Sequence, residues 1–249
     1  MLQLGSKVWW RQVLGVILGP GLVYAYVIAL SADYLNENWL YSWTHSYLEH
    51  YLLWMAFRTG VICAWLWLIF RFVCRDKLSS LTRKPGTLRS DLLDGAAMAF
   101  LMYVTTTYVE GLAETIFHTG DSATYLELKK GAATNLTYTL LHIGPTTWIS
   151  SALGEEFRRI VLLISLWRLS SNKWFSIATI ALSTLLFGLC HIYQGSTGVV
   201  SAAYWGLVAG VYYLYFGRPW ALVISHGLYD TLVGLPALMR CLHNISYHH

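Results

Sequence analysis

Residues 174–230 read WFSIATIALSTLLFGLCHIYQGSTGVVSAAYWGLVAGVYYLYFGRPWALVISHGLYD and decide the fold class. Three apolar runs begin within this stretch, at 175–192, 198–216 and 219–238. Each is close to the roughly 20 residues that a helix needs to cross the hydrocarbon core of a bilayer. We therefore predict three membrane-spanning helices in this part of the chain.

The composition of the whole chain agrees with a membrane location. Of its 249 residues, 56% are hydrophobic and 12% are charged, and the charged share is about half of that in an ordinary soluble protein. The chain holds 12 Trp and 17 Tyr, which are the residues that collect at the interfaces between membrane and water. An ordinary soluble domain is excluded, and the net charge of +4 is too small to indicate a nucleic-acid partner.

Further apolar runs precede residue 174, and they bring the number of expected spans to seven. They cover residues 12–31, 51–74, 92–109 and 146–169. A shorter run at 132–143 is separated from the last of these by Gly144 and Pro145, so it is either a half-helix or the first part of a kinked helix. Lipid leaves backbone groups no partners outside a helix or a closed barrel, and no barrel-like alternation is present. The predicted fold is an all-α, polytopic transmembrane helical bundle of about seven to eight spans.

The loop from Arg71 to Arg89 holds six basic residues against one acid, Asp76. Short basic loops stay on the cytoplasmic side of a membrane. If the run at 132–143 does not cross, Arg168 and Lys173 fall on this same side. We expect a multi-pass integral membrane protein, with the bacterial inner or plasma membrane as its location.

Acidic residues become rare in the second half of the chain. Only three follow residue 127, and all lie within predicted spans: Glu155, Glu156 and Asp230. Two histidines, His191 and His226, also lie within these spans. An ionisable side chain in hydrocarbon costs several kcal/mol unless it is paired or hydrated, so each is a candidate functional residue.

The spacing of these residues indicates acid–base chemistry. Glu155 and Arg159 are four residues apart, so we expect them to pair on one side of a helix. His226 and Asp230 have the same spacing, which places a carboxylate where it can orient an imidazole. A buried carboxylate and imidazole suit general acid–base catalysis, and hydrolysis is the reaction that they indicate. A structural ion pair and histidines that serve packing are the alternative interpretations.

Three segments resemble the motifs of a known family. They are GEEF at 154–157, FGLCH at 187–191 and HGLYD at 226–230. They are similar to the EExxxR, FxxxH and HxxxN/D motifs of the CAAX prenyl protease 2 type of intramembrane protease, also called the CPBP or Abi family. The resemblance implies a protease core over residues 131–240, preceded by transmembrane helices of unknown role over residues 1–130.

The resemblance also implies roles for individual residues. Glu155 would activate water beside His191. His226 would stabilise the oxyanion, and Asp230 stands where the family usually has Asn. Glu156 and Arg159 would support the geometry of the site.

One motif departs from the family pattern. The family places its Arg four residues after the second Glu, and Ile160 stands at that position here. If the glutamates set the register, Glu155 is the base. If Arg159 sets the register, Glu155 takes the second role and the family's first Glu falls on Gly154. The first register fits the GEEF segment directly.

The same residues lead to expectations about the cofactor, the partners and the alternative functions. We expect a site without a tightly bound metal. The alternative is that the His and carboxylate side chains bind a divalent ion such as zinc. The expected partners are the lipid bilayer and a membrane protein or C-terminal-anchor peptide as substrate. The rival functions are a proton-coupled transporter, an inactive membrane binding protein of the same fold, and a rhomboid-like protease that uses Ser196 with His226. Arg58, Glu110 and Glu114 receive no role.

Overall fold

The computed structural model describes residues 6–33, 48–118 and 120–247, and their regular structure is helical throughout. The all-α prediction is therefore confirmed. The α-helices are α1 Ser6–Val16, α2 Leu22–Asp33, α4 Leu48–Leu68, α5 Leu88–Phe117, α6 Ala123–Thr134, α7 Leu136–Leu141, α8 Glu156–Trp167, α9 Lys173–Leu189, α10 Ser196–Phe216 and α11 Pro219–Tyr247. Three segments of π-helix extend them: η1 Ile17–Gly21, η2 Ile69–Val73 and η4 His142–Glu155.

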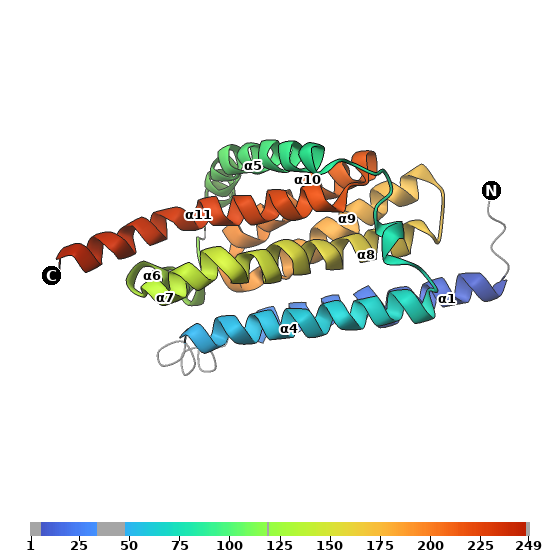
Figure 1. Cartoon of the computed structure of the whole chain (residues 1–249), viewed down its shortest axis with the longest axis horizontal. Helices are drawn as coiled ribbons and strands as arrows, with labels where there is room; N and C mark the ends of the chain where they lie inside the picture. The colour runs from blue at the N-terminus through green and yellow to red at the C-terminus, as the bar shows by residue number, and fades with distance from the viewer. Residues whose placement is uncertain (1–5, 34–47, 119, 248–249) are drawn as a thin grey trace.

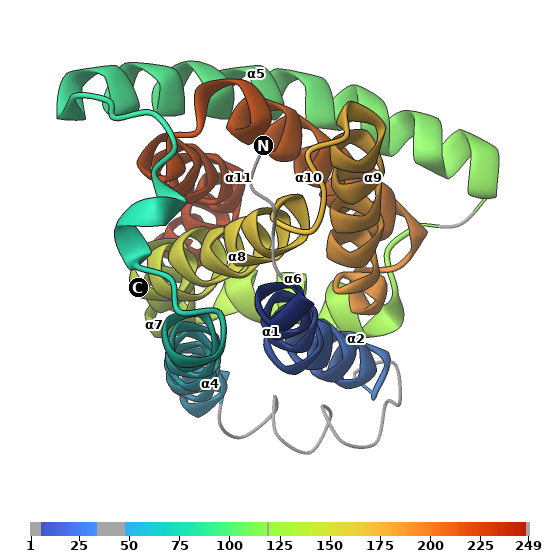
Figure 2. The ribbon, with the colours of Figure 1, turned by 90° about the vertical axis from the view of Figure 1, so that its right-hand side faces the viewer.

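Most helices lie side by side along the long axis of the molecule (Figure 1). The long helix α5 is the exception, because it crosses one side of the bundle and packs against α11 and α10 (Figure 2). The core is formed by apolar side chains from most of the helices. Its most deeply buried members include Leu66, Phe70, Leu163, Ala209, Tyr213 and Leu222.

Five helical stretches among the described residues are long and apolar enough to cross a membrane. They are Trp9–Ala32, Met55–Val73, Leu88–Phe117, Ser196–Phe216 and Pro219–Asn244. The predicted span at 175–192 corresponds to the shorter apolar helix Lys173–Leu189. The predicted span at 146–169 is helical but carries the four charged residues at 155, 156, 158 and 159 in its middle. The architecture is that of a polytopic membrane protein whose charged helix lies among apolar ones.

The helix that carries these charges is kinked. Asn135 begins α7 by accepting a hydrogen bond from the Tyr138 backbone N–H at 2.9 Å. Gly144 then has a non-helical backbone (φ −101°, ψ −109°), and Pro145 has no N–H to continue the hydrogen-bond ladder. The run at 132–143 thus provides the end of α6 and the first part of a kinked helix, which confirms that interpretation. Beyond the kink the chain is π-helical as far as Glu155.

The basic loop packs on one end of the bundle. Arg168, after the end of α8, pairs with Asp76 and donates a hydrogen bond to Ser80 Oγ at 3.1 Å. Gly217 links α10 to α11 with φ +60°, and a Cβ there would lie 2.5 Å from Arg83 Cβ, so glycine is required. The prediction that Arg168 lies on the same side as the basic loop is confirmed.

Candidate active site

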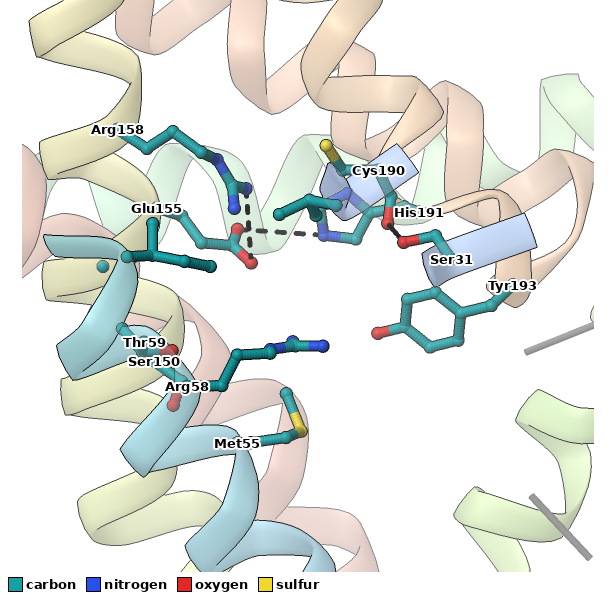
Figure 3. Close-up of a pocket in the computed structure, with 13 residues that line it drawn as sticks. Ser31, Met55, Arg58, Thr59, Ser150, Glu155, Arg158, Cys190, His191 and Tyr193 are labelled. Carbon is teal, nitrogen blue, oxygen red and sulfur yellow. Dashed lines mark hydrogen bonds and ion pairs between the residues drawn. The ribbon is translucent and has the colours of Figure 1, made fainter. Parts of the chain in front are cut away.

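A small cavity lies between the N-terminal helices and the kinked helix (Figure 3). Its walls come from α2, α4, η4, α8 and the connection between α9 and α10. The cavity holds about 50 Å³, which is room for about three water molecules. Glu155 and His191 both line it. Two of the six predicted site residues therefore share a wall of a space that can hold water.

The Glu155 carboxylate and the His191 ring face one another. His191 Nε2 lies 3.8 Å from Glu155 Oε2, which is too far for a direct hydrogen bond. His191 Nδ1 donates to the Phe187 carbonyl oxygen at 2.9 Å, so Nε2 of the neutral ring carries a lone pair. Glu155 Oε2 is buried and has no hydrogen-bond partner among the described residues. One water molecule between these two acceptors can donate a hydrogen to each of them.

The arginine next to Glu155 is Arg158. Its NH2 group lies 4.0 Å from Glu155 Oε1, three residues earlier on the chain. The Arg158 guanidinium also stacks over the Tyr24 ring, 5.1 Å from its centroid. The predicted pairing of Glu155 with Arg159 is therefore wrong. Residues three apart on a helix are neighbours just as residues four apart are, and the packing of the surrounding helices decides between them.

Arg159 pairs with Glu156 instead, inside a buried polar cluster. Both side chains are fully buried, and Arg159 NH1 lies 2.5 Å from Glu156 Oε1. The same carboxylate oxygen accepts hydrogen bonds from His226 Nδ1 at 2.8 Å and from Trp205 Nε1 at 3.1 Å. Three donors from three helices thus converge on one oxygen of Glu156. This cluster fixes α8, α10 and α11 relative to one another.

His226 connects this cluster to Asp230. The Nδ1 atom of His226 donates to Glu156, and its Nε2 atom lies 3.6 Å from Asp230 Oδ2, one turn along α11. The predicted contact between His226 and Asp230 is confirmed. The imidazole also packs against Trp205, with ring centroids 4.8 Å apart. Its orientation is therefore fixed by the hydrogen bond of Nδ1 and by the packing of one ring face.

Phe187 joins the two groups of residues. Its ring centroid lies 4.9 Å from that of His191 and 6.3 Å from that of His226. The Arg159 guanidinium stacks over the same ring at 3.9 Å. Three of the six predicted residues, Arg159, His191 and His226, thus pack against one aromatic ring, which lies between the cavity and the buried cluster.

The donors in the site do not fit a zinc ion. Catalytic zinc needs three protein ligands, and the described part of the chain contains no group of three His, Cys, Asp or Glu side chains placed to hold a metal. Glu155 and His191 supply two possible ligands, while the Oε1 atom of Glu156 already accepts three hydrogen bonds.

Sequence reasoning missed three residues that the structure brings to the site. Trp205 lies in an apolar run, where a tryptophan resembles an interface anchor, and nothing in the sequence marks it as the donor to Glu156. Arg158 is three residues from Glu155, whereas its neighbour Arg159 is four residues from Glu155, and the four-residue spacing led to the choice of Arg159 as the partner. Arg58 lies within the predicted span at 51–74 and receives no role from the sequence, but it lines the cavity with Glu155.

Comparison with known protein families gives one match. The model of a family described as type II CAAX prenyl endopeptidase Rce1-like matches residues 96–232, which is more than half of the chain. No curated protein and no solved structure matched the sequence. The matched region contains Glu155, Glu156, His191, His226 and Asp230. The chain belongs to the Rce1-like family of type II CAAX prenyl endopeptidases.

Proposed function

We propose that this protein is an intramembrane endopeptidase that hydrolyses a peptide bond with water activated by Glu155 and His191. The observation that carries the proposal is the 3.8 Å separation of Glu155 Oε2 and His191 Nε2 at the wall of a water-sized cavity. Both atoms are acceptors, so a water molecule held between them directs its lone pairs away from both, toward a bound substrate.

In the first step, Glu155 takes a proton from this water while the water oxygen attacks the scissile carbonyl carbon. The C–O bond forms, and the carbonyl electrons move onto oxygen to give a tetrahedral oxyanion. His191 accepts the second hydrogen bond of the water and holds its orientation. Arg158 lies 4.0 Å from the other carboxylate oxygen of Glu155 and helps to hold the carboxylate in position.

In the second step, the tetrahedral intermediate collapses and the C–N bond breaks. Glu155 returns its proton to the departing nitrogen, so the products are a carboxylic acid and an amine. His226 stabilises the oxyanion in this proposal, with protons on both ring nitrogens. Nδ1–H stays on Glu156 at 2.8 Å, and Nε2–H turns from Asp230 to the oxyanion.

The proposed substrate is a membrane protein or a peptide near its C-terminal membrane anchor. The match to the family model supports this class, because CAAX sequences are C-terminal and carry a lipid on their cysteine. The site lies among helices long enough to span a bilayer, where a lipid-anchored segment can reach it.

The test is a comparison of membrane proteomes. Cells carrying the wild type, Glu155→Gln or no copy of the protein are scored for new C-terminal fragments. Fragments found only with the wild type support the proposal and reveal the substrate. Identical fragments in wild type and Glu155→Gln contradict Glu155 as the base, and proton-coupled flux abolished by Glu155→Gln without any cleavage favours a transporter instead.

A further inference from the structure

The buried face of α2 reaches the candidate active site from outside the matched family region. All of α2 precedes residue 96, where the family match begins. Tyr24, Val27 and Ser31 are buried and follow one another at intervals of three and four residues, which places them on one face of the helix. Val27 and Ser31 line the catalytic cavity. This face of α2 therefore closes one side of the site.

Ser31 holds the peptide unit that carries His191. Its hydroxyl donates a hydrogen bond to the Cys190 carbonyl oxygen at 2.6 Å (Figure 3). Cys190 stands at the end of α9, where carbonyl groups have no helical donor. The N–H group of the same peptide unit, that of His191, donates to the Gly188 carbonyl oxygen at 2.9 Å. Because a peptide unit is planar, these two bonds together fix the point from which the imidazole extends.

A different segment holds the chain beyond His191. Ser122 donates its hydroxyl to the Tyr193 carbonyl oxygen and its backbone N–H to the Gln194 carbonyl oxygen, the latter at 3.2 Å. These bonds fix the part of the connection that leads into α10, whereas Ser31 fixes the peptide unit before the imidazole. Loss of the Ser31 hydroxyl therefore frees this one peptide unit and leaves the rest of the connection in place.

Tyr24 acts on the other member of the catalytic pair. The Arg158 guanidinium lies over the Tyr24 ring, 5.1 Å from its centroid. The same guanidinium lies 4.0 Å from Glu155 Oε1. The attraction between the cation and the ring keeps Arg158 beside the base. The two contacts of α2 thus act on the two groups, Glu155 and His191, whose 3.8 Å separation leaves a place for the water.

We infer that Ser31 and Tyr24 are positioning residues, through which α2 sets the distance between His191 and Glu155. The inference rests on the proposed function, because the distance matters only if this pair holds the reacting water. Both residues act through a neighbouring group and not on the peptide itself. Their loss should therefore slow the chemical step and leave binding of the peptide nearly unchanged.

The experiment uses the full chain reconstituted in proteoliposomes with a farnesylated CAAX peptide. Equal amounts of protein that elutes as folded material in size-exclusion chromatography are compared, and kcat and KM are measured separately. A displacement of a catalytic group by about 1 Å can cost about 100-fold in rate, so we expect Ser31→Ala and Tyr24→Leu to lower kcat by about 10- to 100-fold. KM should stay close to the wild-type value in both. Tyr24→Phe keeps the ring under Arg158 and should keep kcat.

Tyr213→Phe is the matched control. It also removes one hydroxyl from a buried side chain, and that hydroxyl donates to a backbone carbonyl, that of Leu81. Tyr213 lies about 25 Å along α10 from Ser196, far from the His191 connection. This variant should keep the wild-type kcat and KM.

A Ser31→Ala variant with the wild-type kcat overturns the inference, as does one whose loss of activity lies in KM alone. A Tyr213→Phe variant slowed by the same factor as Ser31→Ala also overturns it, because the effect would then be one of general stability. Glu155→Gln is measured alongside. A wild type that cleaves no more peptide than Glu155→Gln contradicts the proposed function itself, and the inference falls with it.

Discussion

Replacing Glu156 by Gln tests the distinction between the two adjacent glutamates. One oxygen of Glu156 accepts hydrogen bonds from Arg159, His226 and Trp205. Gln is nearly the same size and its amide oxygen can still accept, so the change removes the charge and leaves the shape. A hydrogen bond to a charged group contributes about 1 kcal/mol more than one between neutral groups, so three bonds give a loss of about 3 kcal/mol.

The loss of the buried ion pair leads to a similar decrease in the free energy of unfolding. Both side chains of the Glu156–Arg159 pair are fully buried, and removal of one partner from such a pair costs about 3–5 kcal/mol, because the other charge stays buried. For a chain of this length, 3 kcal/mol corresponds to a decrease in Tm of about 6–12 °C. Glu155→Gln should change Tm little, because Glu155 lies at a cavity wall with 21% of its side chain exposed.

The difference in Tm between Glu156→Gln and Glu155→Gln can be measured with a thiol-reactive dye. Cys190 and Cys241 are buried and free, so the dye reacts with them when the protein unfolds on heating. Glu156→Gln combined with Arg159→Met should be less destabilised than the sum of the two single changes, since both charges of the pair are then gone. A Glu156→Gln variant that unfolds at the wild-type temperature would refute the reasoning, and more strongly so if Glu155→Gln is destabilised.

Three further changes probe the surroundings of the site. Trp205→Phe removes one donor from the buried glutamate, so the free energy of unfolding should fall by about 1.5–3 kcal/mol in the same dye assay; no change would show that this hydrogen bond contributes nothing. In Gly227→Ala the new Cβ would lie 2.7 Å from carbons of the Trp148 ring, so we expect a loss of about 1–3 kcal/mol, whereas Gly60→Ala, with no atom within 4 Å of its Cβ, should be unaffected. Asp230→Asn should keep most of the peptide cleavage and Asp230→Ala should lose it, because an Asn side-chain oxygen can still face His226 Nε2, which lies 3.6 Å from Asp230 Oδ2; equal loss in both would contradict a role of this side chain in orienting His226.

The helical fold could be predicted from the sequence because one rule dominates in lipid. Backbone groups need internal partners, so apolar runs of about 20 residues become helices. The kink at Gly144 and Pro145 was predictable for a similar reason, because Pro cannot continue a helix without a break. The number of membrane spans was harder to predict from the sequence. The reason is that η4 and α8 bear four charged residues, which are accommodated only by packing against other helices.

The site was predictable as a set of residues, and its pairing was not. Ionisable residues in apolar runs pointed to Glu155, Glu156, His191 and His226. The choice between partners three and four residues apart depends on which face of the helix is buried, and the sequence does not encode this locally. Arg159 pairs with Glu156 because both lie on the buried face that meets Trp205.

The displaced arginine of the first motif now has a structural explanation. In this chain Arg159 lies three residues after Glu156 and still reaches it at 2.5 Å. A shift of one position along the motif therefore keeps an arginine on the second glutamate. Glu155 is left facing the cavity with His191.

The most direct measurement of the central claim compares Glu155→Gln with Ser196→Ala in proteoliposomes that contain a farnesylated CAAX peptide. Release of the C-terminal fragment is followed over time at equal amounts of folded protein, as judged by the dye assay. If Glu155 activates the water, Glu155→Gln releases no fragment and Ser196→Ala matches the wild type. Cleavage by Glu155→Gln at the wild-type rate, or loss of cleavage in Ser196→Ala, would contradict the account.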